Sequence, residues 1–103
     1  AAGAARAAAA MRYPPEGIRG LGASVSRAGA WGAFDGYAIS ANAQALCLVQ
    51  AESAAAVANI DAIAATPGVD GVFIGPADLA ADLGHLGQSD HPAVQQAIDH
   101  VLS

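Results

Sequence analysis

The chain has 103 residues, with 4 Lys and Arg against 9 Asp and Glu, and a formal net charge of −5 at pH 7. This acidic balance argues against a nucleic-acid partner, because phosphate backbones are bound by basic surfaces. No apolar stretch is long enough to cross a membrane, and the single cysteine, Cys47, excludes an internal disulfide. We expect a small cytoplasmic protein or part of one, with Cys47 as a buried, reduced thiol.

The first half of the chain predicts two helices separated by a glycine-rich loop. Ala1 to Met11 is alanine-rich and favours a helix, which Pro14-Pro15 must end because proline fixes φ and lacks an amide proton. The glycines that follow are not a dinucleotide-binding fingerprint, because no strand–glycine–helix order surrounds them. Phe34 to Ala43 is the second predicted helix, with Tyr37 and Ile39 as packing residues.

The next stretch predicts a strand followed by a helix. Leu46 to Val49 is a continuous apolar run of strand length, which is typical of a parallel strand buried on both faces. Ala54 to Ala65 is predicted to be helical, with Ser53 as its N-cap. Thr66 to Gly68 ends that helix.

The pattern then repeats towards the end of the chain. Val69 to Ile74 is the second predicted strand, and Gly75 to Ala77 ends it. A short helix is expected over Asp78 to Leu83, followed by a polar loop over Gly84 to His91. Pro92 to Leu102 is the final predicted helix, since proline is favoured at the first helical position.

This β-α-β-α order indicates parallel βα units in an α/β fold. A complete (β/α)8 TIM barrel needs about 250 residues, and two units cannot close one. We therefore predict a partial TIM barrel of about two consecutive βα units plus flanking helices. The chain begins and ends inside predicted helices, so we expect residues 1–103 to be a single fragment of a longer barrel domain.

Two acidic residues follow the two predicted strands. Glu52 and Asp78 are 26 residues apart, which is one βα repeat, and the ends of consecutive parallel strands meet at one edge of a sheet. Two converging carboxylates repel unless one is protonated or a cation lies between them. No Lys or Arg follows Arg27, so a divalent cation such as Mg²⁺ or Mn²⁺ is the simplest solution. For Asp78, a structural role remains open, either as a helix N-cap or as a charge favoured by the positive end of the helix dipole.

The turn before Asp78 adds a second feature. Gly75 leaves the backbone close to any bound group, and amides at a helix start point towards an anion. A metal beside such amides can bind a 2-oxo acid in two places, through its keto and carboxylate groups. A plain turn is the alternative interpretation.

Three segments of the sequence resemble the HpcH/HpaI aldolases: RYPPEGIRGLGAS (Arg12 to Ser24), LVQAE (Leu48 to Glu52) and GVDGVFIGPADLAADLG (Gly68 to Gly84). These are class II, metal-dependent pyruvate aldolases on a (β/α)8 barrel. The resemblance implies cleavage of 4-hydroxy-2-oxo acids, as in aromatic compound catabolism, into pyruvate and an aldehyde. It also implies a homo-oligomer, with a hexamer expected for the full-length protein.

The resemblance implies a role for six residues. Glu52 and Asp78 correspond to the protein ligands of a divalent metal, Mg²⁺, Mn²⁺ or Co²⁺, which acts as a Lewis acid and stabilises the pyruvate enolate. Gln50 corresponds to a glutamine beside the metal. The backbone of Gly75, Pro76 and Ala77 corresponds to the segment that receives the pyruvate carboxylate.

The histidine–aspartate pair and the arginine of the family come from earlier in the barrel, so we assign no catalytic residue to this chain and expect it to be inactive alone. His85 and His91 are interpreted as surface histidines. Two alternatives remain: a citrate-lyase-β-like enzyme acting on acyl-CoA, and a non-catalytic barrel segment. The YPPEGIRG and GPADLAADLG motifs favour the aldolases over the first, and intact Glu52 and Asp78 argue against the second.

Overall fold

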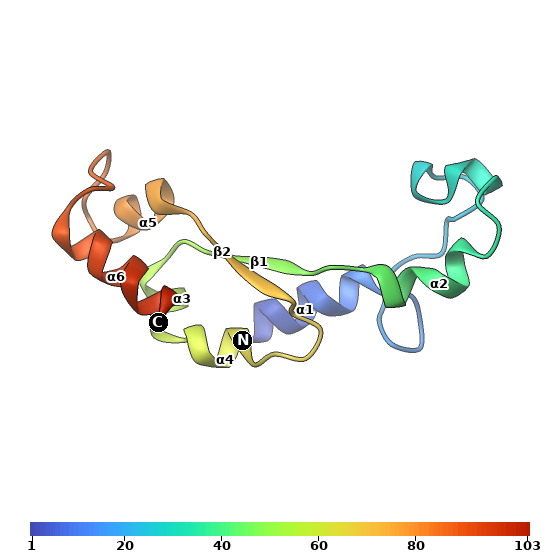
Figure 1. Cartoon of the computed structure of the whole chain (residues 1–103), viewed down its shortest axis with the longest axis horizontal. Helices are drawn as coiled ribbons and strands as arrows, with labels where there is room; N and C mark the ends of the chain where they lie inside the picture. Colours follow the sequence, from blue (N-terminus) through green and yellow to red (C-terminus); the bar gives the residue numbers. More distant parts are fainter.

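The computed structural model describes all residues, 1–103, and has an elongated shape of 51 × 25 × 18 Å (Figure 1). Its elements in chain order are α1 (Ala2–Met11), the 3-10 helix η1 (Arg27–Gly32), α2 (Tyr37–Gln44), β1 (Leu48–Ala51), α3 (Ala54–Ala58), α4 (Ile60–Ala64), β2 (Gly71–Ile74), α5 (Pro76–Asp82) and α6 (Pro92–Leu102). None of these helices has the length and apolar character needed to span a membrane.

The two strands form a parallel pair, as predicted. Leu48 pairs with Gly71 and Ala51 pairs with Ile74, so both strands end at the same level. β1 begins and ends two residues later than predicted, and therefore ends directly before Glu52. The prediction that both faces of the strands are buried was wrong for this chain. Leu48 is 66% exposed and Phe73 is 61% exposed, because a sheet of only two strands in this elongated chain has few neighbours to bury it.

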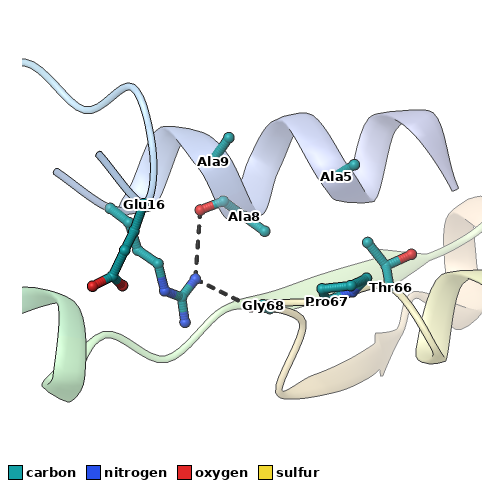
Figure 2. Close-up of a pocket in the computed structure, with 8 residues that line it drawn as sticks. Ala5, Ala8, Ala9, Glu16, Thr66, Pro67 and Gly68 are labelled. Carbon is teal, nitrogen blue, oxygen red and sulfur yellow. Dashed lines mark hydrogen bonds between the residues drawn. The ribbon is translucent and has the colours of Figure 1, made fainter. Parts of the chain in front are cut away.

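A polar clamp holds the starting ends of the strands. Asp70 accepts a hydrogen bond from the Cys47 amide at 2.7 Å, and the Arg12 guanidinium lies 4.0 Å from the same carboxylate oxygen. Arg12 also donates to the carbonyls of Ala8 and Gly68, beside a cavity of about 410 Å³ between α1 and the α4–β2 loop (Figure 2). The end of α1 is thereby fixed to the start of β2.

The helix predicted over Ala54 to Ala65 is two short helices, α3 and α4. They meet at Asn59, whose side-chain amide donates to the Ala55 carbonyl at 2.8 Å. Asparagine competes with helix hydrogen bonding in this way, which explains the break. The Ser53 cap is confirmed, since its hydroxyl accepts from the Ala56 amide at 3.1 Å.

The last two helices supply the best-buried side chains. α5 begins at Pro76, two residues earlier than predicted, because proline suits the first helical position. α6 spans the predicted residues, and His91 caps it by accepting from an amide through Nδ1. Leu79 and Ala80 of α5 and Val94 of α6 are fully buried.

The segment with η1 and α2 extends away from α5 and α6, at the opposite end of the molecule (Figure 1). α2 starts three residues later than predicted, after Gly36, which has φ +75°. Tyr37 packs edge-on against Tyr13, whereas Ile39 is 91% exposed, so the prediction of Ile39 as a packing residue was wrong. Arg19 lies 4.5 Å from the Tyr13 ring and donates to the Tyr37 hydroxyl.

The chain buries little of itself. Only 13 of its 103 residues are buried, and its radius of gyration of 17.1 Å exceeds the ~13 Å of a compact domain of about 100 residues. We therefore expect the isolated 103-residue chain to lose its circular dichroism signal gradually in urea. A single cooperative transition with all probes coincident would contradict this expectation.

A substitution at Leu79 tests how much the core between α5 and α6 stabilises the protein. In the full-length protein, Leu79→Ala should lower the free energy of unfolding by about 2–5 kcal/mol, because it leaves a cavity at a fully buried position. Leu86→Ala is the matched control, since Leu86 is 80% exposed and should change stability little. Urea unfolding measures both, and equal effects of the two substitutions would contradict the core assignment.

Candidate functional site

The carboxyl ends of β1 and β2 form the edge where the candidate site lies. The Gly75 amide donates to the Ala51 carbonyl at 3.1 Å, which extends the ladder one residue beyond β2. Glu52 follows Ala51 directly, so Glu52 and Gly75 leave the sheet next to each other. This is the edge at which ligand sites of parallel α/β sheets lie.

Gly75 is buried and has the side chains of Gln50 and Glu52 directly above it. A Cβ atom placed on Gly75 would lie 2.8 Å from Gln50 Nε2, 2.8 Å from Glu52 Oε2 and 3.0 Å from Glu52 Cβ. Such approaches are possible only because glycine has no side chain. The structure thus brings together three of the residues that the sequence predicted to form a site.

Asp78 stands in the first turn of α5, three residues after Gly75. No side chain caps α5, so Asp78 is not an N-cap, although its carboxylate in the first turn does suit the positive end of the helix dipole. For Glu52 a cap is also unnecessary, because Ser53 caps α3. The only ion pair of the chain joins Arg12 to Asp70, so neither Glu52 nor Asp78 has a basic partner.

The donor atoms at this edge suit a hard divalent cation. Two carboxylates offer oxygen ligands, which Mg²⁺ and Mn²⁺ prefer, and two protein ligands leave positions for water and substrate oxygens. No group of three or more His, Cys, Asp or Glu side chains gathers anywhere in the chain. A zinc-type site with three or four protein ligands is therefore not formed by these residues alone.

In the turn from Gly75 to Asp78, some backbone amides already donate a hydrogen bond and others do not. The Gly75 amide belongs to the sheet ladder, and Pro76 has no amide proton. The amides of Ala77 and Asp78 donate to no backbone carbonyl. An anion at this turn would therefore meet the Ala77 and Asp78 amides, rather than all three residues of the predicted Gly75–Ala77 segment.

Other polar residues take different places. His85 and His91 stack with ring centroids 3.6 Å apart, and both are half-buried rather than fully exposed. Arg19 lies against the rings of Tyr13 and Tyr37 and donates a hydrogen bond to the Tyr37 hydroxyl. Sequence reasoning missed Asp82, whose carboxylate accepts from the Ala54 amide, because its partner is 28 residues away in the chain.

The family model for HpcH/HpaI aldolase/citrate lyase matches residues 1–103. The chain belongs to this family. The resemblance seen in its motifs is thereby confirmed, and a lyase-type enzyme family is established.

Relatives in the HpcH/HpaI family share both sequence and fold with the chain. A 5-keto-4-deoxy-D-glucarate aldolase of Salmonella newport (strain SL254) is 55% identical over 100 residues, which are 97% of this chain and 39% of that protein. The crystal structure of a family member from Burkholderia cenocepacia J2315 is 50% identical, with a TM-score of 0.89, over 96% of this chain and 40% of that one.

An HpcH/HpaI aldolase from Desulfitobacterium hafniense DCB-2 matches with a TM-score of 0.73 at 35% identity, over 91% of this chain and 36% of that one. The chain thus spans about two-fifths of the length of the relatives it matches. Its two parallel βα units agree with part of a barrel of this family.

The contact between Gly75 and the side chains above it can be tested by substitution. In the full-length protein, Gly75→Ala should lower the free energy of unfolding by about 1–3 kcal/mol, because the new methyl group overlaps the Gln50 and Glu52 side chains. Gly20→Ala is the matched control, since no atom lies within 4 Å of its Cβ position. Urea denaturation that gives equal midpoints for both variants would contradict this packing.

Proposed function

We propose that the full-length protein containing this chain is a divalent-metal-dependent aldolase that cleaves 4-hydroxy-2-oxo acids into pyruvate and an aldehyde. The observation that carries this proposal is the gathering of Gln50 and Glu52 over Gly75, at a strand edge where neither Glu52 nor the nearby first-turn residue Asp78 has a basic partner. The family match and the aldolase relatives support the same reaction class.

The substrate named for the Salmonella relative fits this proposal. 5-Keto-4-deoxy-D-glucarate is a six-carbon diacid. Numbered from the end nearer its keto group, it is a 2-oxo acid with a methylene at C3 and a hydroxyl at C4. Cleavage between C3 and C4 releases pyruvate from that end. The proposed substrate class therefore includes the acid on which the relative acts.

The residues of the chain have distinct tasks in this proposal. Glu52 and Asp78 would hold the cation, Mg²⁺, Mn²⁺ or Co²⁺, which when bound supplies Lewis-acid polarisation of the keto oxygen. The free amides of Ala77 and Asp78 would orient the substrate carboxylate. Gln50 would donate to a substrate oxygen through its amide group. Gly75 keeps the backbone accessible, because a side chain there would occupy the space of the Glu52 carboxylate.

The two alternatives have less support. The family description includes citrate lyase, but the relative that is 55% identical is an aldolase. A non-catalytic segment would have no need for two acidic side chains without partners at a strand edge. We also propose that the full-length protein is a cytoplasmic homo-oligomer, a hexamer, whose mass light scattering would measure.

The metal and its ligands are tested together in the full-length protein. Pyruvate release from 4-hydroxy-2-oxo acids, including 5-keto-4-deoxy-D-glucarate, should require Mg²⁺, Mn²⁺ or Co²⁺ and should stop after chelation. Glu52→Gln and Asp78→Asn should each lower turnover by about 100-fold or more, because each removes a charged ligand while keeping the side-chain shape.

Asp61→Asn is the matched control, because Asp61 is an exposed carboxylate in the first turn of α4, outside the strand edge. It should leave turnover unchanged. Activity that survives both chelation and the substitutions at Glu52 and Asp78 would exclude the proposed metal site.

A further inference from the structure

Asp82, the last residue of α5, makes a hydrogen bond to the turn that follows β1. Its Oδ2 atom accepts from the Ala54 amide at 2.7 Å. Ala54 is the first residue of α3 and stands two residues after Glu52. A carboxylate in the last turn of a helix opposes the helix dipole. The Ala54 amide gives Asp82 a favourable partner at this otherwise unfavourable position.

The turn that carries Glu52 is held on both sides by one neighbouring segment. Before Glu52, the Ala51 carbonyl accepts the Gly75 amide at 3.1 Å. After Glu52, the Ala54 amide donates to Asp82. α3 has five residues, none of them fully buried, and it packs against α6. The two hydrogen bonds therefore tie the chain on both sides of Glu52 directly to the β2–α5 segment.

The same α5 helix carries Asp78. Asp78 and Asp82 are four residues apart, so they share one face of the helix with a rise of about 6 Å between them. Leu79 and Ala80, between them, are fully buried and hold α5 in place. The Asp82–Ala54 contact thus links the Glu52 turn directly to the helix that carries Asp78.

We propose that Asp82 is a positioning residue that fixes the Glu52 turn against α5 and thereby sets the affinity of the Glu52–Asp78 pair for a divalent cation. This inference rests on the proposed function. Asp82 does not act as a third ligand, because no three acidic, histidine or cysteine side chains gather in the chain, and its Oδ2 is used by an amide. Residues that orient metal ligands in this way commonly affect metal affinity.

Two substitutions remove the contact from opposite sides in the full-length protein. Asp82→Ala removes the acceptor. Ala54→Pro removes the donor and leaves the Asp82 charge in place. Proline is favoured at the first helical position. The preceding residue, Ser53, already has φ −140° and ψ 156°, which a following proline requires. Asp82→Asn keeps an oxygen acceptor without the charge.

The probe is Mn²⁺ alone, titrated by calorimetry without substrate. Asp82→Ala and Ala54→Pro should each weaken Mn²⁺ binding by about tenfold, and combining them should add nothing, because both break the same hydrogen bond. Asp82→Asn should bind like the unsubstituted protein. Hydrogen exchange at the Ala54 amide should quicken in Asp82→Ala but not in Asp82→Asn. Asp61→Ala, which removes an exposed carboxylate from α4, controls for charge.

The outcomes separate this inference from the proposed function. If Asp82→Asn and Asp82→Ala weakened Mn²⁺ binding equally, the negative charge of Asp82 would be responsible rather than its hydrogen bond to Ala54. That result would overturn the inference. So would unchanged Mn²⁺ affinity in Asp82→Ala while Glu52→Gln and Asp78→Asn weaken binding, a result that leaves the proposed function intact. Unchanged affinity in Glu52→Gln and Asp78→Asn would overturn the metal site itself, and the role of Asp82 with it.

Discussion

The parallel register of β1 and β2 is the constraint on which the candidate site depends. Because Ala51 pairs with Ile74 and the ladder continues through the Gly75 amide, the chain leaves both strands at one level. Glu52 and Gly75 then meet without any contribution from a long loop. A slip of one residue in β1 would turn the Glu52 side chain to the other face of the sheet.

Much of the local structure could be predicted from sequence because its causes are local. The Ser53 cap and the proline start of α6 each depend on neighbours within a few residues. The break between α3 and α4 at Asn59 also has a local cause, but the alanine-rich sequence on both sides of Asn59 favoured a continuous helix. The exposure of Ile39 and Phe73 could not be predicted, because it depends on which elements cover them.

The candidate site was predictable for a different reason. Glu52 and Asp78 stand out by position, each just past an apolar run, and topology alone places such residues at one edge. Two features of the candidate site could be found only in the three-dimensional structure. The division of amides between the ladder and the free end of α5 depends on the Gly75–Ala51 bond. The role of Asp82 depends on a partner 28 residues away, which no periodic pattern reveals.

The carboxylates at the two ends of the strand pair differ in whether they have a basic partner. At the starting end, Asp70 accepts the Cys47 amide and faces the Arg12 guanidinium, so its charge is satisfied within the chain. At the other end, Glu52 and Asp78 have no basic partner, and all four basic residues precede the strands. Negative charge without internal compensation favours a bound cation, whereas a charge that has a guanidinium beside it does not. The distribution of arginine, more than the number of acidic residues, thus distinguishes the end that stabilises the fold from the end suited to binding.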